Sequence, residues 1–130
     1  MTTKKLWKFP VPSTAIRETK LICSGTGAQL LFSYDDIHHN DVLLHSGITF
    51  DMPQAYRHSS EAFVTSLMDA YDYLVEVEGS EWVAGMKKTN PRIADFWKIK
   101  HYAIFLKSNG LFEFIARGFK MLGTEMGPLT

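Results

Sequence analysis

The chain has 130 residues, of which 45% are hydrophobic and 13% aromatic, a composition that excludes a disordered protein and predicts one folded core. Lys and Arg number 14, as do Asp and Glu, so the formal net charge is zero. Neutrality argues against nucleic-acid binding, which needs a basic surface to neutralise phosphates. We expect a single domain over residues 1–130 that binds no nucleic acid.

The sequence offers no membrane or export signal. Its apolar runs are a few residues long, too short to span a bilayer, and its amino terminus lacks the apolar region of a signal peptide. Cys23 is the single cysteine, so no intrachain disulfide can form. We therefore expect a cytoplasmic protein that does not bind membranes.

Residues 1–14 are expected to form an extended arm, because Pro10 and Pro12 disfavour regular pairing. Trp7 and Phe9 point to the same side of an extended segment. We favour an arm that these two side chains anchor on the protein's own core. The alternative is an arm exchanged between subunits.

Three β-prone runs follow, at residues 19–23, 28–34 and 42–50. A Gly-Thr-Gly sequence joins the first two, and we interpret it as a turn. The dinucleotide-binding motif would need a third glycine and then a helix, whereas Leu30 stands at the third position within a β-prone run. Gly47 indicates a bulge or a close approach in the third run.

Residues 53–65 allow two interpretations. A serine could cap a helix whose apolar positions reach Leu74, or residues 55–64 could be a strand with a helix beginning near Ser66. We favour the strand followed by the shorter helix.

Two helix starts are better defined. Ser80 is a predicted N-cap for a helix over residues 81–88. Asn90 is a second cap, with Pro91 at the first position of a helix that reaches Trp97.

Asn109-Gly110 predicts a two-residue hairpin turn between strands at 99–107 and 111–117. That turn would place Phe105 opposite Phe114 and Leu106 opposite Glu113. Both strands are apolar on both faces, so we expect the hairpin to be covered on both sides. Residues 120–130 are glycine-rich and are expected to be a frayed tail.

The order of these elements predicts an α+β fold. We expect a mainly antiparallel sheet of about five to six strands, with two or three short helices inserted before a C-terminal β-hairpin.

Five sequence segments form a recognisable pattern. LLFSYDD, GITF, AYRHSSEAF, AYDYLVEVEGSEWV and HYAIFLKSNGLFEFIA occur in this order within residues 14–118. Together they resemble a family of small uncharacterised bacterial proteins. The resemblance implies that residues 55–64 form a strand, and it implies no activity and no catalytic residue. Residues 66–68 depart from the pattern, which has a tryptophan-containing segment there.

One loop collects possible metal ligands, namely Asp36, His38, His39 and Asp41. Their spacing matches no ligand motif, so we interpret the loop as solvated and expect no metal and no cofactor.

A second polar group is Arg57, His58 and Glu61, with His101 and Glu113 in the hairpin. A buried acid is costly unless it is paired, so we expect Glu113 to pair with Arg57 or Arg117. A catalytic interpretation would make His101 and Glu113 an acid–base pair. The predicted register places them on opposite faces, which argues against contact.

These observations favour a non-catalytic protein that acts through protein–protein interaction, with another protein or with a second copy as a homodimer. An immunity-like or regulatory protein of bacteria would be of this kind. The alternative is a small hydrolase or small-ligand-binding enzyme that uses His101, Glu113 and the Arg57–Glu61 group. A deep pocket at these side chains would favour the enzyme, and an exposed patch would favour the binding protein.

Overall fold

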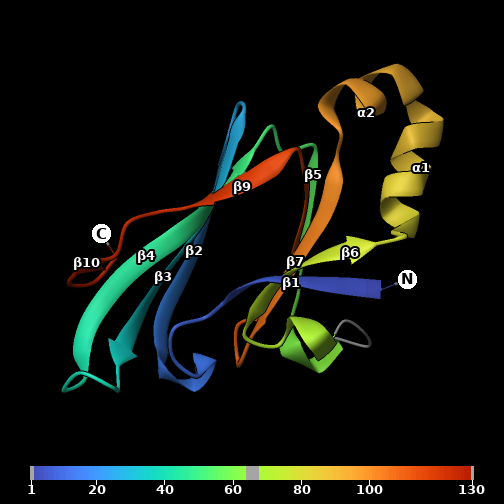
Figure 1. Ribbon diagram of the computed structural model, residues 1–130. Helices are drawn as coiled ribbons and strands as arrows, with labels where there is room; N and C mark the ends of the chain where they lie inside the picture. The colour runs from blue at the N-terminus through green and yellow to red at the C-terminus, as the bar shows by residue number, and fades with distance from the viewer. Residues whose placement is uncertain (1, 64–67, 130) are drawn as a thin grey trace.

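A computed structural model describes residues 2–63 and 68–129. Ten strands and two α-helices form within these ranges, arranged as two five-stranded sheets and a helical pair (Figure 1). The named strands all pair antiparallel, which agrees with the predicted α+β fold. The ten strands exceed the five to six that we expected.

Sheet A contains the predicted hairpin. Its spatial order is β1 (Thr2–Lys8), β6 (Tyr73–Glu78), β7 (Lys100–Leu106), β8 (Gly110–Ala116) and β5 (Ala55–Ser59).

Sheet B contains the three early strands and the chain end. Its order is β10 (Glu125–Met126), β4 (Val42–Asp51), β3 (Gly27–Asp36) and β2 (Ile16–Ser24), and β9 (Gly118–Met121) also pairs with β4. Residues 120–130 are thus not simply a frayed tail, because β9 and β10 hydrogen-bond to β4.

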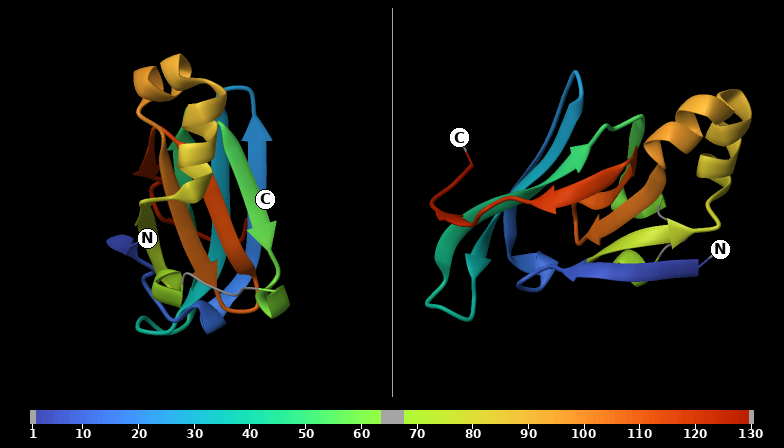
Figure 2. Two further views of the ribbon diagram at one scale, coloured as in Figure 1. Left: turned by 90° about the vertical axis from the view of Figure 1, so that its right-hand side faces the viewer. Right: turned by 45° about the horizontal axis from the view of Figure 1, so that its top comes forward.

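The two sheets pack face to face, and their apolar side chains form the main core (Figure 2). Phe50 of sheet B stacks on Phe114 of sheet A with ring centroids 3.9 Å apart. Phe9 is buried in this core and makes an edge contact with Trp7 at 5.8 Å. The N-terminal arm is therefore anchored on the chain's own core, where it forms the edge strand β1.

The helices α1 (Glu81–Thr89) and α2 (Pro91–Trp97) lie on the side of sheet A that faces away from sheet B (Figures 1 and 2). The Ser80 hydroxyl accepts a hydrogen bond from the backbone N–H of Val83, and the Asn90 side chain accepts one from Ile93, so both predicted caps are confirmed. Neither described helix has the length and apolar character needed to cross a membrane.

The segment between β5 and α1 differs in part from the prediction. Strand β5 confirms the favoured interpretation over residues 55–59, and 3₁₀ turns follow at Glu61–Phe63 and Met68–Ala70. The expected start of a helix at Ser66 lies outside the described residues. Leu74 lies in strand β6, not in a helix, because this strand fills the gap between β1 and β7 and buries both of its faces.

The hairpin register is the most consequential correction. Leu106 pairs with Gly110 and Ala103 pairs with Glu113, so the loop has three residues, 107–109, instead of two. Leu106 faces the core between the sheets. The predicted register would have set Glu113 opposite Leu106, within that apolar core, whereas the observed register moves it to the outer face of sheet A.

Candidate functional site

The densest polar group lies on the outer face of sheet A and is formed by Arg57, His101 and Glu113. Arg57 on β5 is directly opposite Glu113 on β8. Its Nε donates to Glu113 Oε1 at 2.8 Å and its Nη2 to Oε2 at 3.1 Å. His101 on β7 reaches the same carboxylate, with Nε2 at 2.7 Å from Oε2. The expected ion pair with Arg57 is confirmed, and Arg117 instead pairs with Asp51.

Ser80 extends this group to the helical pair. Its Oγ lies 2.8 Å from His101 Nδ1 while it also caps α1. A carboxylate only accepts hydrogen bonds, so Nε2 of His101 carries a proton, and in the neutral ring Nδ1 accepts the Ser80 hydroxyl. Ser80, His101, Glu113 and Arg57 therefore form one continuous network, named here the sheet A network.

Trp82 covers the network. The Arg57 guanidinium lies 4.3 Å from the Trp82 ring centroid, which is cation–π geometry, and the His101 ring meets the indole edge-on at 5.4 Å. Under this cover Ser80 is 8% exposed, His101 4% and Glu113 2%.

The pKa of Glu113 reports the balance of forces in the network. Burial raises this pKa, but the hydrogen bonds from His101 and Arg57 and the charges of these two groups outweigh burial and lower it to about 2. The hydrogen bond to Glu113 in turn raises the pKa of Arg57. Glu113 is therefore an anion across the physiological range, held by two partners.

His58 and Glu61 do not join this network. His58 stacks on Phe112 with centroids 4.4 Å apart and donates from Nε2 to the carbonyl of Asn109. Glu61 pairs with Lys107 at 2.9 Å. Both therefore support the hairpin turn, and the predicted cluster of five residues is two separate groups.

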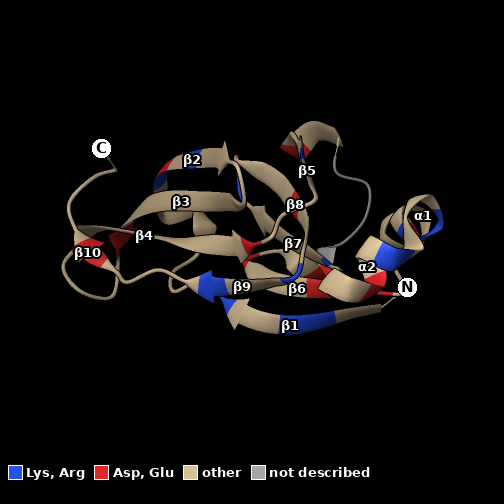
Figure 3. Cartoon of the chain, turned by 90° about the horizontal axis from the view of Figure 1, so that it is seen from above, with Lys and Arg blue, Asp and Glu red and all other residues tan. Residues whose placement is uncertain are grey.

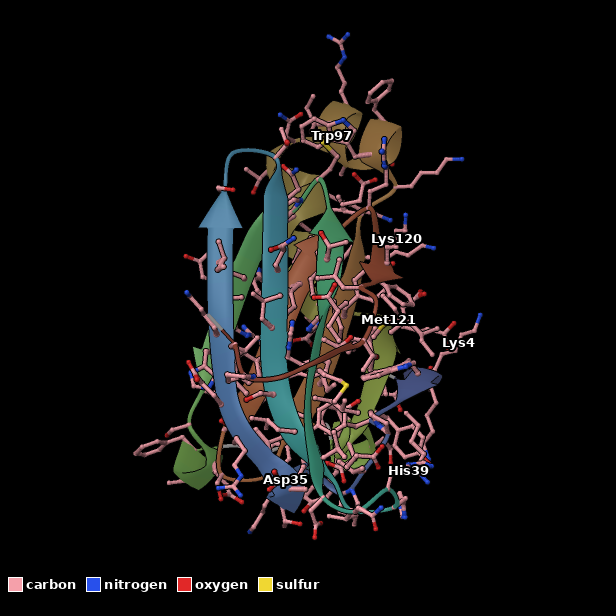
Figure 4. All side chains as sticks on the ribbon, turned by 90° about the vertical axis from the view of Figure 1, so that its left-hand side faces the viewer. Lys4, Asp35, His39, Trp97, Lys120 and Met121 are labelled. Carbon is pink, nitrogen blue, oxygen red and sulfur yellow. The ribbon has the colours of Figure 1, made fainter. Side chains whose placement is uncertain are left out.

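The possible metal ligands lie at one end of sheet B, where Figure 4 labels Asp35 and His39, far from Trp97 at the other end of the molecule. Asp36 accepts from His39 Nδ1 at 2.9 Å and from the backbone N–H of His38. Within residues 2–63 and 68–129, no three His, Cys, Asp or Glu side chains are grouped as a metal site.

Hydrolases use a serine, a histidine and an acid linked by hydrogen bonds. Such a network can be catalytic only if a substrate can reach the serine hydroxyl. Two cavities of about 410 and 450 Å³ are lined by the β2–β3 turn, with residues 53–56 beside the first and the start of β9 beside the second. Neither is lined by Ser80, His101 or Glu113. Neither cavity therefore gives a substrate access to the buried Ser80 hydroxyl, which already accepts the backbone N–H of Val83 as the helix cap.

A second candidate lies on the helical pair. A cavity of about 200 Å³ between α1 and α2 is lined mainly by apolar side chains, including Met86, Ile93, Trp97 and Ile99. Ile93, which lines this cavity, is 40% exposed, and Phe96 is 78% exposed. Their i, i+3 spacing places the two side chains next to each other on α2. We name Ile93, Phe96 and this cavity the α2 face.

Sequence reasoning named neither Ser80 as a member of the network nor the α2 face as a surface. The capping signal identified Ser80, but its contact with His101 depends on how α1 packs against β7, which no local pattern encodes.

Comparison with known proteins gives no relative: no family model, no curated protein and no solved structure matches this chain. The resemblance in the sequence therefore stays a prediction, and function must be inferred from the chain's own geometry.

Proposed function

We propose that this chain is a non-catalytic protein that binds another protein through the α2 face. The observation that carries the proposal is the 78% exposure of Phe96, one helical turn from Ile93, which is itself exposed and lines an apolar cavity. Aromatic side chains beside an apolar pocket are typical anchors of protein interfaces. An immunity-like role, in which the chain would block a toxin, is one form of this function.

The burial of the sheet A network supports binding over catalysis. An enzyme of the Ser–His–acid type needs its hydroxyl beside a substrate cavity. Here Ser80 caps α1, and Trp82 lies over Arg57 and His101. The network is better suited to fastening the helical pair to sheet A, which would hold the α2 face in a fixed position.

The test is site-specific photo-crosslinking in the native cell, with a photoreactive phenylalanine analogue at Phe96 or, as a control, at Ile37. Ile37 is 47% exposed and lies in the loop between β3 and β4. We expect one discrete protein adduct from position 96 and none from position 37, and Ile93→Asp should abolish it. No adduct at 96, or equal adducts at both positions, would contradict the proposal. So would hydrolysis of model esters that is lost in His101→Gln.

Self-association is a second candidate, favoured by the edge strand β2. This nine-residue strand is exposed along much of its length and pairs regularly with β3 from Glu18 to Ser24. Natural edges are protected by lysines, bulges or short length. The edge strand β1 has Lys4, Lys5 and Lys8 and an irregularity in its middle, and β5 has five residues. Strand β2 also has one lysine, Lys20, and an irregularity, but the irregularity lies at its first residues, so β2 has the longest uninterrupted pairing of these three edges. We infer that a second copy would pair along β2.

A further inference from the structure

We propose that the α2 face receives an acidic segment of its partner, which inserts one apolar side chain between α1 and α2. This inference rests on the proposed function and adds the chemical class of the partner. Three features of the helical pair support it: the size of the cavity, the charge around it and the absence of ion-pair partners for that charge among the described residues.

The cavity is suited to a single anchor. At about 200 Å³ it is smaller than the sites that enclose whole small molecules. Its lining includes the buried residues Ala94 and Ile99 and the partly buried Trp97 and Met86. One large apolar side chain from a partner would fill this space, with Phe96 packing against the same segment outside it.

The charge around the cavity is one-sided. Residues 81–99, which include both helices, carry four Lys or Arg and two Asp or Glu residues, a net charge of +2, so the rest of this neutral chain carries −2. Figure 3 shows lysine and arginine on both helices. The positive residues adjoin in sequence those that line the cavity: Lys87 follows Met86, Arg92 precedes Ile93, and Lys98 precedes Ile99.

Ion pairs and helix-dipole interactions within the described residues do not account for all of these cations. Each is exposed, and none lies within 4.0 Å of a carboxylate oxygen among the residues that the structure describes. Lys87 and Lys88 favour the C-terminus of α1, but Arg92 stands at the N-terminus of α2, where a positive charge is unfavourable. A cation at that position fits an external anionic partner.

A peptide display experiment tests the partner class without knowledge of the natural partner. Short random peptides are selected on the whole chain, and the enriched peptides are then measured by fluorescence polarisation against variants. We expect enrichment of Asp and Glu around one or two of Phe, Leu or Trp. Binding should weaken about tenfold in Ile93→Asp, the loss typical of a central contact. Ile37→Asp, with similar exposure at the other end of the molecule, should bind unchanged.

Charge is tested separately with Arg92→Glu. This substitution favours the dipole of α2, so weaker binding cannot come from a weaker helix. We expect roughly a fivefold loss, together with salt sensitivity, whereas Lys120→Glu on β9 should have no effect.

The outcomes separate the two proposals. Neutral peptides that need Ile93 but ignore Arg92 and salt would overturn the acidic class and leave the proposed function intact. Enriched peptides that bind Ile93→Asp as well as the original chain, or no enrichment at all, would overturn both. Tighter binding of a single-stranded RNA probe at the same residues would also overturn the proposal, because it would make nucleic acid the ligand.

Discussion

Glu113→Gln removes the negative charge of the sheet A network and keeps the size of the side chain. The Glu113 side chain is 3% exposed and accepts hydrogen bonds from Arg57 and His101. Lowering its pKa from 4.5 to about 2 corresponds to about 3 kcal/mol in favour of the charged form. The Arg57 side chain is 54% exposed, so water screens part of this gain. We expect the free energy of unfolding at pH 7 to fall by about 2 kcal/mol.

The direction of the pKa shift determines how the effect of Glu113→Gln on stability changes with pH. The folded-state pKa of Glu113 is depressed, so its contribution is present above about pH 4.5 and is lost as the pH falls through about 2. The difference between the original chain and the variant should therefore be constant near neutrality and should shrink over that acid range.

Urea unfolding followed by tryptophan fluorescence, at several pH values, measures both quantities. The matched control is Glu125→Gln, because Glu125 also pairs with a histidine, His45, but its side chain is 76% exposed. We expect the control to change stability by less than about 0.5 kcal/mol. A Glu113→Gln variant as stable as the control at pH 7, or a difference that persists at pH 2, would refute the reasoning.

Three further predictions address the sheets and the helix cap. Gly47→Ala should destabilise the chain by about 2 kcal/mol in urea unfolding, because a Cβ there would meet Leu31 Cδ2 at 2.7 Å. As a control, Gly85→Ala within α1 adds a Cβ that meets nothing within 4 Å and should stabilise the chain by roughly 0.5–1 kcal/mol. Ser80→Ala should cost about 1–2 kcal/mol in the same assay, through the lost cap and an unpaired histidine nitrogen; an unchanged midpoint would contradict this. Ile22→Lys should shift light scattering from dimer to monomer by weakening β2 pairing, and a chain that is monomeric before substitution would exclude that pairing.

The helix caps, which sequence reasoning predicted well, are determined by neighbours in the chain. Ser80 and Asn90 cap helices by accepting from N–H groups three residues ahead, so residue type and spacing are enough. The close approach expected at Gly47 is present, although β3 and β4 pair there without a bulge. Strand β6 was missed because its apolar positions also fit a helix. This segment forms a strand because it pairs with β1 and β7, which are distant in sequence.

The hairpin shows how one local error changes a functional inference. Asn109-Gly110 is a strong signal for a two-residue turn, yet the loop has three residues, and Gly110 pairs with Leu106 at a positive φ of 96°. Side chains alternate between faces, so moving the register by an odd number of residues transfers Glu113 to the opposite face. The two-residue turn would have buried this acid between the sheets without a cation.

In the structure the β5–β8 pairing sets Arg57 opposite Glu113, and the hairpin register places His101 diagonal to Glu113, so the charge of Glu113 is paired. The cost of a buried unpaired charge far exceeds the preference of a turn sequence, which is why the partners of Glu113 determine the register. The argument against contact between His101 and Glu113 rested on the turn alone and was wrong. The stronger constraint was already in the sequence: an acid in an apolar strand must face the side of the sheet on which a cation can reach it.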